Sequence, residues 1–106
     1  MSMEEISKKI VEQKKVYAAA RAGAAVMDHN RTVVLASVKN SIEANIVNSG
    51  EKAPSEAKLE RMAKDTQEYR DAISQHGREL KESIIAEAEL EGLERSYEIA
   101  KINATA

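Results

Sequence analysis

Apolar residues recur every three or four positions along the first 48 residues of the chain. This alternation is the a/d spacing of a coiled-coil helix. Ser2 and Glu5 precede it at the spacing of a capping box, in which each side chain satisfies the other's free backbone N–H. The pattern predicts a helix over residues 3–48. Its apolar stripe consists of Met3, Ile6, Ile10, Tyr17, Ala20, Ala24 and Met27, with Gln13 as one polar exception.

Residues 28–32 are the ambiguous part of this helix. They are polar, and the β-branched Val33 and Val34 that follow favour a strand by propensity. A break, a kink or a short strand is therefore an alternative to continued helix. We favour continued helix because an apolar stripe with i+4 spacing resumes directly afterwards. That stripe consists of Val34, Val38, Ile42 and Ile46, with Leu35 alongside.

A loop is predicted over residues 49–54, followed by a short helix. Gly50 can adopt the left-handed conformation that is common just past a helix C-terminus. Pro54 cannot continue a preceding helix but suits the entrance to the next one. The short helix is expected over residues 55–64. Its inward-facing residues are predicted to be Leu59, Met62 and Ala63.

The last predicted element is a long helix over residues 66–102. It opens at Asp65-Thr66-Gln67-Glu68, which has the spacing of a second capping box. Its stripe begins with Tyr69, Ile73, Gly77, Leu80, Ile84 and Ala88, and then shifts phase to Leu90, Leu93, Tyr97 and Ala100. A shifted phase predicts that the buried face rotates or that the coil locally unwinds.

These elements predict an all-α fold, a long helical hairpin in a single domain over residues 1–106. The stripes are wider than one seam, because Val11, Leu35 and Ile85 lie beside them. One hairpin covers a single side of each helix, so we expect the chain to form a homo-oligomer, as a dimeric four-helix bundle or a coiled-coil assembly. The predicted oligomer interface consists of Ile10, Tyr17, Ala24, Val34, Val38, Ile42, Ile73, Leu80, Ile84, Leu93 and Tyr97.

Composition supports helix and narrows the chemistry. The chain has neither Phe nor Trp. It also has no Cys, so neither disulfides nor thiolate chemistry is available. No apolar run approaches the length of a membrane span, and the N-terminus begins with acids where a signal peptide would be basic. We therefore expect no membrane contact and a cytoplasmic location.

The charge is distributed unevenly. Net charge is −2, but residues 1–40 carry seven Lys/Arg against four acids, and residues 41–106 carry nine against fourteen. The favoured interpretation is that the oppositely charged helices pair with each other. The alternative is a basic face that contacts nucleic-acid phosphates. Its candidate residues are Lys8, Lys9, Lys14, Lys15 and Arg21.

Catalytic and metal-binding patterns are not found. Neither His29 nor His76 has a Glu three residues before it, as the metal sites of helical bundles require. No Ser or Thr stands beside a base with a third orienting group, and no glycine-rich loop could cradle a phosphate. We expect a protein that is not an enzyme and holds no metal or cofactor.

Three short segments carry a family resemblance: residues 55–63, Glu68-Tyr69-Arg70 and Ser96-Tyr97-Glu98. Together they resemble small helical proteins encoded in the recombination and replication cassettes of tailed bacteriophages. The resemblance covers somewhat under half of the chain. Asp65-Thr66 stands where that group often has Ser-Pro, and the C-terminal stretch lacks the group's basic, aromatic-bearing ending. That second departure argues against direct contact with DNA.

Three functional hypotheses follow. The leading one is an oligomeric accessory or scaffold protein that binds a protein partner in phage DNA recombination or replication, in the host cytoplasm. The second is a nucleic-acid-binding protein that uses the basic N-terminal helix. The third is an acidic inhibitor of a host DNA-processing protein, in which Glu87, Glu91 and Glu94 would mimic DNA phosphates.

Overall fold

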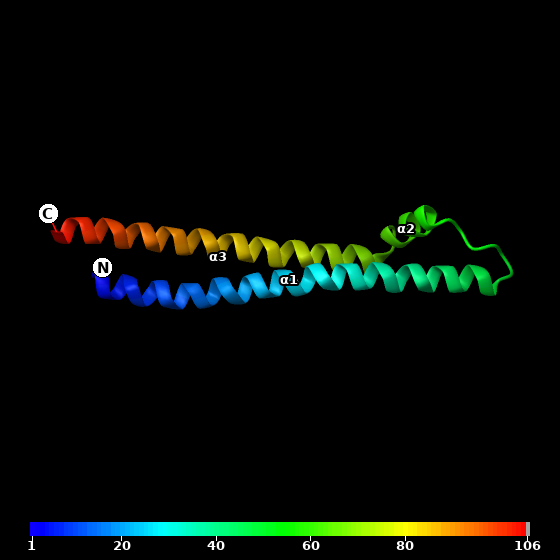
Figure 1. The fold of residues 1–106 in the computed structure, drawn as a ribbon, viewed down its shortest axis with the longest axis horizontal. Coiled ribbons are helices and arrows are strands. Elements are labelled where there is room, and N and C mark those ends of the chain that lie inside the picture. The colour runs from blue at the N-terminus through cyan, green and yellow to red at the C-terminus, as the bar shows by residue number, and fades with distance from the viewer. Residues whose placement is uncertain (106) are drawn as a thin grey trace. The chain divides into compact units, whose positions relative to one another are not determined.

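The structure, a computed structural model that describes residues 1–105, is an all-α helical hairpin, as the sequence predicts. Its three helices are α1 (Met3–Asn48), α2 (Glu56–Lys64) and α3 (Gln67–Thr105), shown in chain order in Figure 1. α1 continues without interruption through residues 28–32, and α3 extends three residues beyond its predicted end. No strand is found in the described part of the chain.

The chain folds as two compact units. Unit 1 joins Met1–Ala24 to the C-terminal part of the chain from Glu79, and unit 2 is Ala25–Arg78. In unit 1, the Gln13 side chain donates hydrogen bonds to the Ala86 carbonyl at 3.0 Å and to the Glu89 carboxylate at 3.2 Å. In unit 2, Asp28 lies beside His76. In unit 1, Ile10 borders the same groove as Tyr97, and Ala20 the same groove as Glu79. In unit 2, Ser41 borders the same groove as Glu68. Within each unit, later residues of α1 therefore meet earlier residues of α3, so the two helices are antiparallel.

Local signals place the helix ends. The Ser2 hydroxyl accepts from the Glu5 N–H at 3.1 Å, and the Ser55 hydroxyl accepts from the Lys58 N–H at 3.3 Å. Gly50 has a φ of +88°, the left-handed conformation that the sequence predicts. Two backbone bonds close α1, from the Gly50 N–H to Val47 and from the Glu51 N–H to Ile46. This pair of bonds is a Schellman motif, which satisfies carbonyls that the helix leaves free.

The predicted capping box at residues 65–68 is wrong by one residue. The Thr66 hydroxyl, not the Asp65 carboxylate, accepts from a first-turn N–H of α3, that of Tyr69 at 3.3 Å. Asp65 instead ends α2, where its N–H bonds back to Met62 and Ala63. Its backbone and carboxylate oxygens accept from Arg70 at 3.0 and 3.3 Å. The two helices follow so closely that one residue ends the first and its neighbour begins the second.

The inward-facing row of α1 agrees with the predicted stripe. In unit 1, Ile6 and Ala24 are buried, and Met3, Ile10, Gln13, Tyr17 and Ala20 are half-buried. In unit 2, Met27, Val34, Leu35, Val38, Ile42 and Ile46 are half-buried.

The first half of the predicted α3 stripe is wrong beyond Tyr69, which is buried. Ile73, Leu80 and Ile84 are exposed, and smaller or polar residues face inward in their place: Ala72 and His76 in unit 2, and Glu79, Ser83 and Ala86 in unit 1. The second half, Leu90, Leu93, Tyr97 and Ala100, faces inward as predicted. In both units the spacing of the inward-facing residues alternates three and four, so no shift of phase is needed. Alanine allows two helices to approach closely, whereas larger side chains would hold them apart.

The core of unit 2 includes residues of α2. Leu59 and Ala63 are buried there, at 2% and 0% exposure, together with Tyr69 and Ala72. The prediction that Met62 faces inward is wrong, because this side chain is 36% exposed. With nine residues, α2 has room for only one narrow buried face. The Lys39 ammonium of α1 bonds to the Glu56 carboxylate of α2, and this bond raises the pKa of Lys39.

The capping correction yields a first prediction. Thr66→Ala removes the acceptor for the Tyr69 N–H and should lower the free energy of unfolding by about 1 kcal/mol. Thr66→Ser keeps the hydroxyl and should restore most of the loss. Asp65→Ala removes only an exposed ion pair and should cost about 0.5 kcal/mol or less. Urea unfolding at one fixed protein concentration measures all three; a larger effect at Asp65 would contradict this assignment.

The core of unit 2 yields a second prediction. Leu59→Ala should destabilise the chain by about 3 kcal/mol, because it removes a fully buried side chain and leaves a cavity. Met62→Ala is the matched control on the same short helix and should cost about 0.5 kcal/mol. Thermal unfolding followed by circular dichroism distinguishes the two. Equal losses of stability in the two variants would indicate that Met62 is also part of the core.

Candidate protein-interaction surface

The predicted oligomer-interface residues divide into two groups. Eight of them face inward within a single chain, so the hairpin itself uses much of their apolar surface: Ile10, Tyr17, Ala24, Val34, Val38, Ile42, Leu93 and Tyr97. Ile73 in unit 2 and Leu80 and Ile84 in unit 1 remain exposed, at 41%, 43% and 65%. Leu80 and Ile84 are four residues apart and therefore share a face of α3. This face has no cover within unit 1.

A groove follows one side of unit 1. Its floor is formed by Val16, Ala19 and Ala20 of α1 with Ile85 and Ala86 of α3. Its rim carries Glu79, Glu82 and Glu89, and its volume is about 530 Å³. We call it the acidic groove. Its apolar floor and anionic rim are unlike the other side of unit 1.

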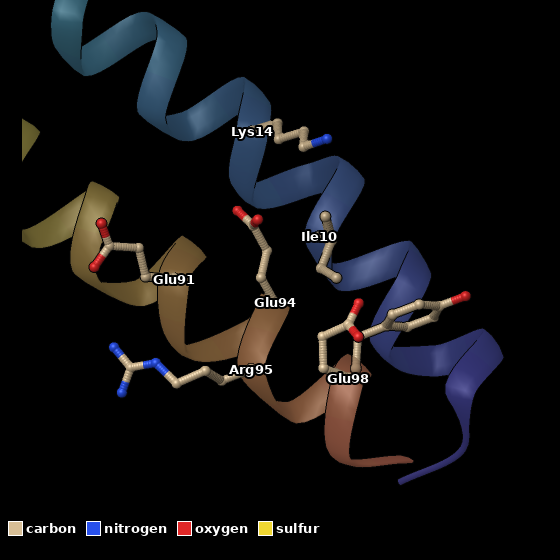
Figure 2. Close-up of a pocket in the computed structure, with 7 residues that line it drawn as sticks. Ile10, Lys14, Glu91, Glu94, Arg95 and Glu98 are labelled. Atoms are coloured by element: carbon tan, nitrogen blue, oxygen red, sulfur yellow. The ribbon is translucent and has the colours of Figure 1, made fainter. Parts of the chain in front are cut away.

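A second groove in unit 1 has mixed charge. Figure 2 shows Ile10 and Lys14 projecting from α1 opposite four charged residues of α3. These are Glu91, Glu94, Arg95 and Glu98, with Tyr97 between them. The Glu94 side chain extends toward α1, whereas Arg95 points away from it (Figure 2). The second groove has a volume of about 480 Å³, and its cations and anions offer no single charge to a ligand.

The interpretation that the basic and acidic helices pair with each other holds for one ion pair in the described residues, between Lys39 of α1 and Glu56 of α2. The lysines near the start of α1 do not pair with α3. Lys8 pairs with Glu4 at 3.7 Å and Lys15 with Glu12 at 3.3 Å, both within α1. The Arg21 guanidinium lies 5.6 Å from the centre of the Tyr17 ring, again on α1. Within the described chain, none of the seven glutamates from Glu79 onward forms an ion pair. Residues three and four apart are neighbours on a helix surface, so Lys8 and Lys15 find their glutamates on α1 itself.

The candidate nucleic-acid residues do not gather into one patch. Lys8, Lys9, Lys14, Lys15 and Arg21 are all exposed. The helical repeat places Lys8 and Lys15 on one face of α1 and Lys14 and Arg21 on a second, with Lys9 on a third. No single face therefore presents more than two of these five cations.

Unit 2 encloses a polar cluster. Arg31 Nη2 donates to the Asp28 carboxylate at 2.8 Å, and the His76 Nε2 lies 3.9 Å from the same carboxylate. The hydrogen bond from Arg31 lowers the pKa of Asp28 and raises that of Arg31, and the Tyr69 hydroxyl adds to the second effect. The Arg31 Nε is buried without a hydrogen-bond partner. A polar residue in an inward position favours one register of the two helices over its neighbours.

Two further features are absent from residues 1–105, a metal-binding group and a membrane-spanning helix. The side chains of His, Asp and Glu there form no group of three or more that could hold a metal ion. None of the three helices combines the length and the apolar character needed to cross a membrane.

Comparisons with known proteins return nothing: no family model, curated protein or solved structure matches this chain.

Sequence reasoning did not identify the acidic groove. A signal was present, because Val16, Ala19 and Gly23 lie three and four residues apart beside the main stripe. Small residues at this spacing form a second helical row. Which acids line that row depends on how α3 aligns with α1, and the incorrect stripe of α3 placed Glu79 and Glu82 away from it.

The Asp28–Arg31 bond yields a third prediction. A carboxyl whose folded-state pKa is lowered stabilises the fold fully above its ordinary value of 3.8, and this contribution is lost as pH falls through the lowered value. Arg31→Met should raise the pKa of Asp28 toward 3.8, as followed by NMR titration of its carboxyl carbon. Arg21→Met, which removes a cation from the same helix, should leave it unchanged. An unchanged Asp28 in the Arg31 variant would contradict this cause.

Proposed function

We propose that this chain is a non-enzymatic helical scaffold that self-associates and binds a protein partner. The observation that carries the proposal is the exposed apolar face of Leu80 and Ile84 in unit 1. Within residues 1–105, eight hydrophobic side chains are buried, whereas thirteen large ones are exposed. Exposed apolar surface of this extent is a mark of association, and four-helix bundles assembled from two hairpins cover such faces.

The resemblance to small helical proteins of tailed-bacteriophage cassettes supplies the biological setting of the proposal. In that setting the scaffold serves DNA recombination or replication through a protein partner, in the cytoplasm of the bacterial host. The nucleic-acid alternative has less support, because its five cations lie on three faces of α1 and two of them are already paired with glutamates. Fluorescence anisotropy with single- and double-stranded oligonucleotides at low salt distinguishes these two functions.

Self-association yields a fourth prediction. Sedimentation velocity should find more than one chain per particle at high concentration. The double variant Leu80→Glu/Ile84→Glu should raise the dissociation constant roughly 100-fold or more, since an unpaired buried charge costs about 3–5 kcal/mol. Both positions are exposed within the single chain, so helicity by circular dichroism should be unchanged.

Val47→Glu is the matched control for this experiment. Val47 is 48% exposed, close to the 43% of Leu80, but lies in the last turns of α1 in unit 2. It should leave the dissociation constant within about threefold of the unmodified chain. A chain that sediments as a monomer at every concentration would overturn the self-association part of the proposal.

A further inference from the structure

The acidic groove combines an open apolar floor with a row of anions. Val16 is 53% exposed and Ile85 47%, so the largest floor residues on the two helices are both accessible. The other floor residues, Ala19, Ala20 and Ala86, have short side chains that do not fill the groove. An apolar trough between two helices is the surface on which an amphipathic helix lays its apolar face.

The rim carries negative charge that the chain itself does not neutralise. Within residues 1–105, Glu79, Glu82 and Glu89 have no cationic partner within 4.0 Å. Glu89 accepts one hydrogen bond, at 3.2 Å from the neutral Gln13 amide. Glu82 and Glu89 are seven residues apart and therefore follow the same edge of α3, with Ile85 between them.

Gly23 keeps a space open for the third carboxylate. A Cβ atom on this residue would come within 2.8 Å of the Glu79 Oε2. The half-buried Glu79 therefore places its charge beside the α1 backbone, where any larger residue would displace it. Glu79 therefore borders the floor from the interface between the two helices, whereas Glu82 and Glu89 border it from the exposed edge of α3.

The negative charge of the rim and the open shape of the acidic groove argue against three kinds of ligand. Two acidic grooves that faced each other across a symmetric dimer would bring six glutamates together, which opposes pairing of this face with its own copy. Phosphates of a nucleic acid would be repelled in the same way. An enclosed pocket for a small molecule would bury most of its ligand, whereas this groove is an open trough along two helices.

We propose that the acidic groove binds a basic amphipathic helix of a partner protein. Apolar residues of that helix, three and four apart, lie on Val16 and Ile85, and its Lys or Arg side chains reach Glu79, Glu82 and Glu89. This inference rests on the proposed function as a scaffold, and it names the chemistry of the partner. It does not depend on self-association, which uses the face of Leu80 and Ile84.

The test uses the full chain and a designed peptide. The probe is a fluorescent peptide of roughly 20 residues made of leucine and lysine, with all leucines on one helical face, long enough to hold a helix in water. A peptide with the same composition but scrambled order is the probe control. Fluorescence anisotropy should detect binding of the amphipathic peptide that is at least tenfold tighter than that of the scrambled one and weakens with added salt.

Two groups of glutamates on the same helix provide matched variants. Glu79→Gln/Glu82→Gln/Glu89→Gln removes the rim charge and should weaken binding at least tenfold. Glu87→Gln/Glu91→Gln/Glu94→Gln removes the same charge from outside the acidic groove and should change it less than threefold. Equal losses in both variants would identify diffuse attraction to an acidic helix and overturn the proposal.

A third variant tests the floor without changing charge. Val16→Ser/Ile85→Ser should also weaken binding at least tenfold, with helicity retained because both side chains are exposed. Unchanged binding in this variant, or no binding by the intact chain, would overturn the proposal. So would a rim variant that changes the subunit number in sedimentation velocity, because a second copy would then be the occupant.

The peptide experiment is repeated in the Leu80→Glu/Ile84→Glu background, which separates it from the test of the proposed function. Selective binding by the double variant would show that the groove acts without self-association. Selective binding by an intact chain that sediments as a monomer at every concentration would support the groove and refute self-association. An oligomeric intact chain that does not bind the peptide would refute only the proposal that the acidic groove binds a basic amphipathic helix.

Discussion

Close contact between the small inward faces of α1 and α3 is the constraint on which this structure depends. In unit 1 the helices meet through Ala20 and Ala24 on one side and Ser83 and Ala86 on the other. Such residues contribute little apolar area each, but they allow the backbones to approach. The Gln13 side chain can then reach the Ala86 carbonyl of the opposite helix. Contacts between small residues and a hydrogen bond between the helices therefore contribute to holding the hairpin together, alongside the larger side chains.

A seam of small residues leaves the larger ones elsewhere. Ile84 and Ile85 of α3 are both exposed, on either side of a buried row that includes Ala86. Apolar side chains in this position make little contribution to the fold of one chain, and their exposure to water opposes solubility. We propose an apolar partner for the Leu80 and Ile84 face and a cationic one for the acidic groove, whose rim carries Glu79, Glu82 and Glu89.

The ion pairs of the two units also differ. Lys8 and Lys15 of α1 pair with glutamates one turn away, Lys39 pairs with Glu56 of α2, and the acids of α3 have no cationic partner in the described chain. In unit 2 the situation differs, because Arg31 and Asp28 bind each other beside His76 inside the seam. Arg31 and His76 are half-buried polar residues in inward positions, which favour one alignment of the two helices within unit 2.

The sequence by itself determined the three helices and most of their ends. Ser2, Ser55 and Gly50 act through bonds to residues a few positions away, and the stripe of α1 follows from a repeat that one helix contains. Only the tertiary structure decided which face of α3 is buried, because that depends on how closely α1 allows it to approach. The largest apolar residues suggested Ile73, Leu80 and Ile84, whereas packing against alanines selected Ala72, Glu79 and Ala86. The acidic groove exists only in that alignment, since its floor and rim come from residues more than sixty positions apart, such as Val16 and Ile85.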